Sequence, residues 1–404
     1  MQRRQGWSQR KLAACRGRLE QFAEDVFASL ARQDQRARGL AYVRGLLLAG
    51  KRKSCEPMAA RLGDVHPQAL HHFLQASPWD WEPVRRRLAE LACQALDPGA
   101  WIVDDTGFPK DGAGSAGVAR QYSGTLGKVA NCQVGVSVSA GGERGSAPVD
   151  WQLFLPESWD GDPQRRQAAH IPDQQHHQPK WQLALALLEE LHAWGLPPLP
   201  VTSDAGYGEV PTFRLGLETR GLDYMTGVPS TASAQPAHAH PSLPAWSGRG
   251  RRPTRRRYPD RPTTVRELVL AAGQQACVDL IWRRGSRGLQ RSRFVALPVR
   301  PAGKVLLDAY PDGLPLRWLL AEWPTGQAEP TRYWLSNLPL STPIVELVRL
   351  AKLRLRIEGD YRDQKDALGL GHHGGRSWQG WHHHVTLVSA AHLFCTLERR
   401  RSRP

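Results

Sequence analysis

The order of apolar runs between residues 98 and 229 most constrains how this chain can fold. Three short β-rich runs separated by Gly-rich turns predict strands over Trp101–Val103, Val129–Ala140 and Val149–Leu155. The next elements expected are a helix over Pro179–Trp194, a strand over Leu199–Ser203, a helix over Thr212–Glu218 and a strand over Leu222–Gly227. Three strands followed by helix, strand, helix and strand indicate an α/β layer fold.

The residues before this region predict a separate helical domain over 1–97. Apolar residues recur there at three- and four-residue spacing, which predicts helices over Leu19–Arg32, Ala41–Leu48, Pro57–Leu62, Pro67–Leu74 and Trp79–Leu96. Basic residues such as Arg44 and Lys51 suit a domain that binds DNA ends, and they suit a packing domain equally well. The sequence leaves both interpretations open.

Between residues 230 and 341 the alternation of strands and helices stops. The segment 232–262 is rich in Pro, Gly and Arg, and strands are expected after it over Thr264–Ala272, Ala276–Arg283, Arg293–Ala296, Val305–Ala309, Leu316–Glu322 and Arg332–Ser336. We interpret 230–341 as an inserted β-rich subdomain whose Arg-rich loop either contacts DNA or is a solvated disordered loop. In the last part, 342–404, a long helix from Pro343 to Ala367 and a final helix over His384–Arg399 are expected.

The net charge of the chain indicates what kind of molecule it binds. The chain has 54 Lys and Arg against 38 Asp and Glu, a formal net charge of +16, and its arginines are clustered. Such a surface attracts polyanions, so nucleic acid is the expected partner and affinity should fall with salt. The six cysteines form no Cys-x-x-Cys pair, and no apolar stretch is long enough to span a membrane, so a reduced, cytoplasmic protein is expected.

Three acidic residues carry the expected chemistry. Asp104 closes one apolar run, Asp204 ends another, and Glu358 lies in a charged helical stretch. Carboxylates at the ends of two strands and on one helix can converge on two Mg²⁺ ions, which take oxygen ligands, and Mn²⁺ should substitute. Asp105 is the adjacent candidate, because neighbouring side chains on a strand point to opposite faces and only one can face the Glu helix.

Several motifs in a fixed order resemble the DDE transposases of bacterial insertion sequences, in particular the group with a β-strand insertion between the second Asp and the Glu. These motifs are Asp104–Lys110, Arg120–Gly124 with Asn131–Gln133, Ser203–Gly208, and Glu358 with Lys365. The resemblance runs from about residue 40 to the C-terminus. The interval from Asp204 to Glu358 also exceeds one helix and one strand, which requires an insertion there.

The resemblance implies a ribonuclease-H-like mixed-sheet core that nicks DNA at the ends of an element and transfers the freed 3′-hydroxyl into target DNA. It favours Asp104 over Asp105 through the family's Asp-x-Thr spacing, and it implies DNA contacts by Arg354 and Lys365 on the face of Glu358. The Tyr that the family carries seven residues before its Glu is Ala351 here, so that DNA contact is not expected. The implied partner is double-stranded DNA, comprising terminal repeats and target, bound by a homodimer on paired ends.

Further DNA contacts are expected from basic and aromatic residues. We assign Lys110, Arg120, Gln121 and Lys128 to backbone phosphates, with solvated loop charges as the alternative. The Arg-rich loop adds Arg251, Arg252, Arg255, Arg256 and Arg257. Trp378, in the segment 376–384, is expected to be exposed beside cations and to stack on an unpaired base. The nearby histidines have no Cys partner and are not expected to bind zinc.

Two other functions are weighed against a transposase. A domesticated relative that holds DNA ends without cutting would keep the same surface, although the presence of all three carboxylates argues against it. A glycoside hydrolase could use two of the carboxylates, but the net charge of +16 disfavours it.

Overall fold

The computed structural model of the protein describes residues 9–124, 127–285 and 288–401. The chain forms two compact units. The first contains the residues up to Pro98, Asp104–Pro197 and the residues from Arg356 onward, and the second contains Gly99–Val103 and Pro198–Leu355. Strand β1 (Ala100–Pro109) passes from the second unit into the first.

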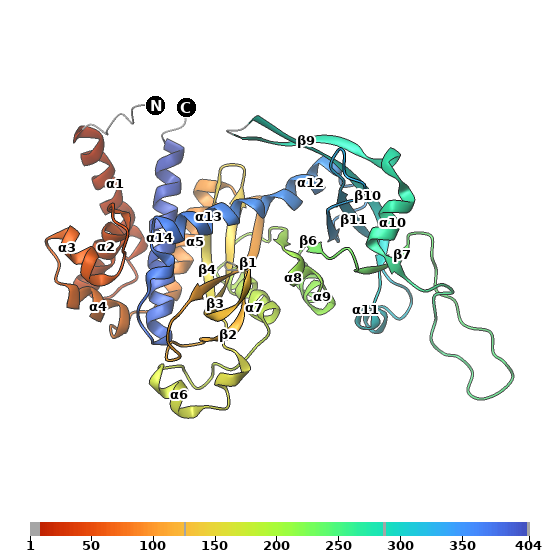
Figure 1. Ribbon diagram of the computed structural model, residues 1–404, viewed down its shortest axis with the longest axis horizontal. Coiled ribbons are helices and arrows are strands. Elements are labelled where there is room, and N and C mark those ends of the chain that lie inside the picture. Colours follow the sequence, from red (N-terminus) through yellow and green to blue (C-terminus); the bar gives the residue numbers. More distant parts are fainter. Residues whose placement is uncertain (1–8, 125–126, 286–287, 402–404) are drawn as a thin grey trace. The chain divides into compact units, whose positions relative to one another are not determined.

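The first unit begins with the expected helical region (Figure 1). Its helices are α1 (Gln9–Val26), α2 (Gln33–Leu47), α3 (Cys55–Leu62), α4 (Pro67–Gln75) and α5 (Glu82–Leu96). The last helix, α14 (Trp378–Arg401), packs against α2, α4, α5 and strand β4. Because it is surrounded in this way, α14 is buried on almost every side from Trp378 to Phe394. It is the central helix of the unit's helical part.

The strands of the first unit form an antiparallel group around β3 (Lys128–Gly142). Strands β2 (Ala119–Ser123) and β4 (Gly145–Leu153) both pair with β3 in antiparallel fashion, and β1 is its neighbour on the path through the sheet. Helices α6 (Pro163–Ala168) and α7 (Lys180–Ala193) follow, and α7 packs on β3 and β4. Residues 132–142 of β3 are all buried, so both faces of this strand are covered.

The second unit continues from β1 in the parallel sense. Strand β5 (Val201–Ser203) lies parallel to β1, with Trp101 opposite Val201, and β6 (Tyr224–Val228) lies parallel to β5. Helices α8 (Ala205–Gly208) and α9 (Pro211–Thr219) connect β5 to β6. With β3 and β5 as the neighbours of β1, the order β4-β3-β1-β5-β6 is that of the predicted ribonuclease-H-like core, and the predicted fold class is confirmed.

The inserted segment extends the sheet of the second unit. From β6 the strands continue as β12 (Arg332–Ser336), β11 (Arg317–Glu322), β10 (Gly288–Pro301), β7 (Ser233–Pro236) and β8 (Thr263–Thr264), and β9 (Val278–Gly285) pairs with β10. All of these pairings are antiparallel. The unit's apolar core includes Val228 of β6 together with Val295 of β10 and Leu319 of β11, so the insertion shares one core with the strand before it.

Two segments of the insertion that were expected to be strands are helices. Thr264–Ala272 is mostly α10 (Val265–Ala272), and Val305–Ala309 belongs to α11 (Lys304–Ala309). In α10 the Thr264 and Glu267 side chains form a reciprocal N-terminal cap, and Val265 and Val269, one turn apart, are both buried. These features outweigh the β-branched composition that favoured a strand.

The C-terminal helices also differ from the expectation. The single helix predicted over Pro343–Ala367 is two helices, α12 (Ile344–Leu353) and α13 (Leu355–Asp366), which meet at Arg354. The final helix begins at Trp378, six residues before the predicted start. Across the described residues, none of the helices is both long enough and apolar enough to cross a membrane.

A buried ionic network joins the helices of the first unit to its strands. The guanidinium of Arg85, on α5, donates to Asp150 Oδ1 of β4 at 3.1 Å and to Thr386 Oγ1 of α14 at 2.7 Å. Arg85 and Asp150 are 3% and 0% exposed. Burial and the neighbouring Asp150 carboxylate raise the pKa of Glu190, on α7, to about 8. Loss of one partner would leave a charge buried without compensation.

Candidate metal-dependent nuclease site

The middle of strand β1 presents the two adjacent aspartates to different surroundings, because the strand continues past the apolar run to Pro109. Successive side chains of a strand point to opposite faces, so Asp104 and Thr106 lie on one face of β1 and Asp105 on the other. Asp104 is 6% exposed. The Asp105 carboxylate forms an ion pair with Lys180 of α7, at 2.8 Å. Asp104 Oδ1 accepts a hydrogen bond from the Asp105 backbone N–H, at 2.8 Å.

Helix α13, which carries Glu358, contacts β1 on the face of Asp104. Lys365 Nζ donates to Thr106 Oγ1 at 2.6 Å and to the Gly107 carbonyl at 2.9 Å. Burial lowers the pKa of Lys365 to about 8. Tyr361 Oη is hydrogen-bonded to Ser137 Oγ of β3 at 2.7 Å. Glu358 lies three residues before Tyr361 and seven before Lys365, on the same stripe of the helix, and it is exposed.

Asp204 directly follows β5 in the second unit. Its Oδ1 accepts the Tyr207 backbone N–H at 3.3 Å and so caps the short helix α8. Its Oδ2 lies 3.5 Å from Arg354 Nη2, and the Asp204 side chain is 37% exposed. Gly208 allows a close approach to the backbone of β6, because a Cβ there would lie 2.0 Å from the Gly227 carbonyl oxygen. This glycine therefore lets α8 pack closely on the backbone of β6.

The three carboxylates suit a hard divalent cation through their donor chemistry, since Mg²⁺ is bound by carboxylate oxygens. Asp104 and Glu358 belong to the first unit and Asp204 to the second. Over the parts of the chain that the structure describes, no group of three or more His, Cys, Asp or Glu side chains is gathered as a metal site. Arg354 supplies positive charge at the Asp204 carboxylate. It lies at the junction of α12 and α13 and pairs with Asp204, while Glu358 and Lys365 belong to α13.

The four residues expected to contact phosphates divide into two groups. Arg120 and Lys128, on β2 and β3, are exposed to solvent. Lys110 Nζ donates to the His373 carbonyl at 2.5 Å, and burial lowers the pKa of Lys110 to about 8. Gln121 Nε2 donates to the Cys132 carbonyl at 2.8 Å. Lys110 and Gln121 therefore make contacts within the protein, at the base of the β2–β3 hairpin.

The Arg-rich loop is exposed along its length. The predicted arginines of the loop are all solvent-exposed: Arg251, Arg252, Arg255, Arg256 and Arg257. The Arg252 guanidinium lies 5.1 Å from the centroid of the Trp246 ring, and Arg255 pairs with Asp308 at 3.6 Å. Backbone hydrogen bonds of 2.9 and 2.8 Å between Ser242 and Arg257 join the two ends of the loop. The loop thus forms a basic projection closed at its base.

The predicted exposure of Trp378 is wrong. Trp378 is 3% and Trp381 1% exposed, because this segment is the buried start of α14. The two ring nitrogens of His383 lie 2.9 Å from the Leu74 and Trp79 carbonyl oxygens, one of which accepts the single N–H of the neutral ring, and the ring stacks on Trp79 with a centroid distance of 3.8 Å. Burial lowers the pKa of His383 to about 4. These aromatic residues connect α14 to the N-terminal helices.

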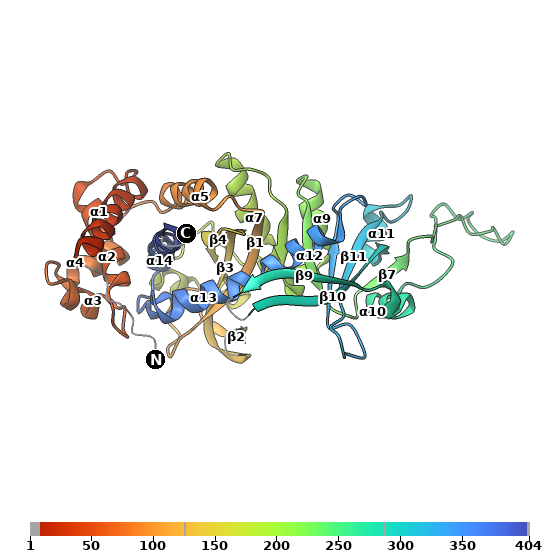
Figure 2. The same cartoon turned by 90° about the horizontal axis from the view of Figure 1, so that it is seen from above.

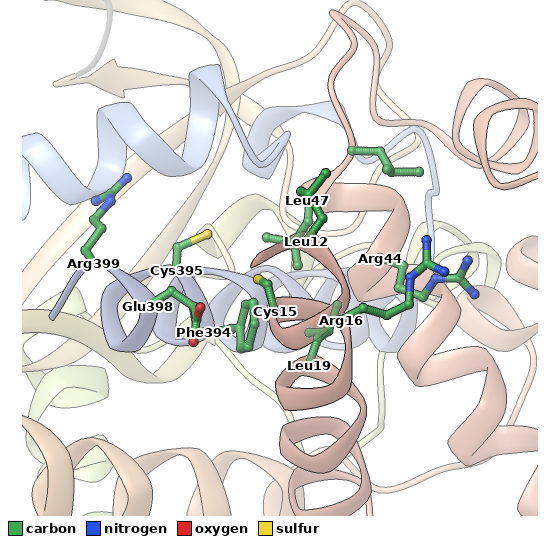
Figure 3. Close-up of a pocket in the computed structure, with 11 residues that line it drawn as sticks. Leu12, Cys15, Arg16, Leu19, Arg44, Leu47, Phe394, Cys395, Glu398 and Arg399 are labelled. Carbon is green, nitrogen blue, oxygen red and sulfur yellow. The ribbon is translucent and has the colours of Figure 1, made fainter. Parts of the chain in front are cut away.

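The structure also contains a cavity that the sequence did not indicate (Figure 3). It lies beside α1, α2 and α14 in the first unit and has a volume of about 660 Å³. Its lining is mainly apolar, with Leu12, Leu19, Leu47 and Phe394, and it includes the thiols of Cys15 and Cys395. None of the predicted site residues lines it.

Comparison with known proteins places the chain in a family. The sequence model of the DDE superfamily endonucleases matches residues 25–289, and the protein belongs to this family, as the motifs predicted. The chain is also 33% identical over 183 residues to the probable transposase for insertion sequence element IS701 of Microchaete diplosiphon. That match covers 45% of this chain and 45% of the relative. Asp104 and Asp204 lie within the family match, and Glu358 lies beyond it.

Proposed function

We propose that the protein is the DNA transposase of an insertion sequence, which nicks DNA at the element ends and joins the freed 3′-hydroxyl to target DNA. The observation that carries the proposal is the contact of α13 with β1. The chain belongs to the DDE superfamily endonucleases, and its helix α13, which carries Glu358, is attached through Lys365 to the face of β1 that carries Asp104. One acidic residue on this helix and one on this strand would supply two of the metal ligands that such a nuclease requires.

The proposed metal ligands are Asp104, Asp204 and Glu358. Two bound divalent ions, Mg²⁺ by preference with Mn²⁺ as a substitute, would activate the attacking water or 3′-hydroxyl and neutralise charge at phosphorus. The protein's own contribution is positioning. Lys365 fixes α13 on β1, and Arg354 balances the charge of Asp204. Asp105 is paired with Lys180 on the opposite face of β1, which supports Asp104 as the ligand.

The DNA contacts that we propose come from exposed cations. Arg120 and Lys128 on the β2–β3 hairpin and the exposed arginines of the 249–257 loop would bind backbone phosphates, and the net charge of +16 supports a polyanionic partner. We further propose that residues 1–97 act as a helical domain before a core formed by 98–229 and 342–404, that 230–341 is the insertion, and that a homodimer holds paired ends in the cytoplasm.

A cleavage assay tests this function. The protein is incubated with Mg²⁺ and labelled DNA that carries the element's own ends. We expect Glu358→Gln and Asp204→Asn to abolish nicking and strand transfer and to leave DNA affinity within about twofold, because the basic surface is unchanged. Asp363→Asn is the matched control for Glu358→Gln, since Asp363 lies on the same helix and pairs with Arg399 instead.

Two outcomes would contradict the proposal. If Glu358→Gln cleaves as well as Asp363→Asn, Glu358 is not a metal ligand. If the unchanged protein binds the ends and never cuts them, the protein is an inactive, end-binding relative of the family.

A further inference from the structure

The hairpin of β9 and β10 is an unusual part of the inserted segment. Among the residues that the structure describes, strand β9 pairs with β10 alone, so it is an edge strand of the sheet, and the two strands run side by side as a long hairpin (Figure 2). Edge strands of stable proteins are commonly protected by charged side chains. Residues 282–293 contain five arginines and no acidic residue, which is far more charge than protection of an edge requires.

One face of the hairpin is anchored to the protein. Lys352 of α12 has its Nζ 4.8 Å from the ring centroid of Trp282 on β9 and 5.3 Å from that of Phe294 on β10. The same Nζ forms an ion pair with Glu322 of β11 at 2.6 Å, and the Lys352 side chain is 5% exposed. A cation held against aromatic rings and a carboxylate fixes the base of the hairpin to α12.

The opposite face of the hairpin, which we call the outer face, carries Ile281, Leu289 and Arg291 together with Asp279 and Arg293. The register places Arg291 opposite Ile281 and Arg293 opposite Asp279, and Leu289 lies two residues from Arg291 along β10, so these side chains share a face that Phe294 does not. Ile281 is 53% and Leu289 54% exposed, and Arg291 is exposed. Apolar side chains flanked by arginine on an open strand are typical of a binding surface.

Exposed arginines on the hairpin favour an anionic partner. Arg283 is exposed on β9, just beyond the anchored Trp282. Asp279 pairs with Arg291 at 2.5 Å and is the one acidic residue in 278–301. A second copy of this chain would bring a further +16 of like charge to this surface, whereas DNA would bring phosphates. Charge complementarity therefore selects duplex DNA.

We propose that the β9–β10 hairpin binds duplex DNA as a basic β-ribbon, with its outer face in the major groove and Arg283 and Arg291 on phosphates. Two strands about 4.8 Å apart fit a groove about 12 Å wide. Ile281 and Leu289 then face base edges and sugars, where an apolar side chain can contact a thymine methyl group. This inference rests on DNA being the partner in the proposed function, and it assigns a second contact separate from the 249–257 loop.

The test compares two double variants of equal charge. Arg283→Ser/Arg291→Ser removes the two hairpin cations, and Arg220→Ser/Lys304→Ser removes two exposed cations elsewhere in the second unit. Fluorescence anisotropy with an element-end duplex gives Kd at a series of KCl concentrations. We expect the hairpin variant to flatten the slope of log affinity against log salt by about 1 to 2, at roughly 0.9 per lost phosphate contact, and the control to leave it unchanged.

Protection of guanine N7 from dimethyl sulfate reports on the groove, and we expect the unchanged protein and the control variant to protect N7 in the duplex. A folded hairpin variant, verified by thermal melting, should lose that protection. Equal slopes and equal protection for the hairpin variant and the control would overturn the inference. So would a change in the sedimentation of the DNA-free protein with no change in DNA binding, because it would show an interface between copies. Failure of the proposed function would appear differently, as an absence of cleavage by the unchanged protein.

Discussion

Replacement of Asp104 and Asp105 in turn tests the geometry of the middle of β1. For Asp105→Ala, the lost interaction is an ion pair with Lys180 at 2.8 Å between side chains that are 23% and 39% exposed. A partly exposed pair of this kind is worth about 0.5 to 1 kcal/mol, so the melting temperature should fall by about 2 °C. Cleavage of the element-end DNA should stay within about twofold, because this carboxylate lies on the face of α7.

The Asp104→Ala variant should behave in the opposite way. Loss of a proposed metal ligand removes several kcal/mol of transition-state stabilisation, and about 4 kcal/mol corresponds to a roughly 1,000-fold slower nicking rate. Because Asp104 is 6% exposed, Asp104→Asn serves as the variant of equal volume. Rates are measured by gel assay in Mg²⁺ and in Mn²⁺, with thermal melts of every variant. An inactive Asp105→Ala beside an active Asp104→Ala would shift the strand register by one residue, and activity in both would place the catalytic centre elsewhere.

Three further predictions concern stability and binding. Arg85→Met leaves Asp150 buried without its cation, so the free energy of unfolding in a urea titration should fall by about 3 to 5 kcal/mol, and an unchanged midpoint would refute the role of this network. The pKa of Glu190 is about 8 in the folded protein against an ordinary 4.5, so its contribution to stability is present below pH 4.5 and is lost as the pH rises through 8. Glu190→Gln should remove this pH dependence. Between pH 5 and pH 9, the free energy of unfolding of the variant should therefore rise by about 1 to 3 kcal/mol relative to that of the original protein, after allowance for partial exposure. Parallel curves of stability against pH for the two proteins would contradict this role of Glu190. Replacement of the five loop arginines with serine should weaken binding to all DNA sequences and flatten its salt dependence. These arginines are Arg251, Arg252, Arg255, Arg256 and Arg257. A loss of binding confined to the element ends would show that the loop recognises a DNA sequence.

The sequence predicted the core strands because their apolar runs are bounded by turn residues. Val129–Ala140, for example, lies inside β3 (Lys128–Gly142). Short apolar segments were ambiguous, since Thr264–Ala272 has the β-branched composition of a strand and the capping pair of a helix. The Thr264-x-x-Glu267 spacing was a readable signal that could have identified the helix.

The candidate site was less predictable where it depends on long-range contacts. The positions of the acidic residues follow from local patterns, but the contact that separates Asp105 from Asp104 comes from Lys180, far along the chain. Lys110 was expected on DNA, and its partner His373 lies 263 residues away. Trp378 resembled an exposed aromatic because its neighbours are basic, while its burial results from the packing of α14 on the N-terminal helices. These tertiary partners could not be predicted from the residues next to each position in the sequence.

The continuation of the sheet from β6 into β12 limits how this protein can be shortened. Tyr333–Ser336 of β12 pairs with Met225–Val228 of β6, which is four of the five residues in each strand. Removal of residues 230–341 would therefore leave β6 with an open hydrogen-bonding edge, which is a template for aggregation. A relative that lacked the insertion would need another strand or a covering helix at this position. The insertion thus seals the edge of the sheet at β6, and its loss would expose that edge as well as remove the proposed DNA contacts of the loop and the hairpin.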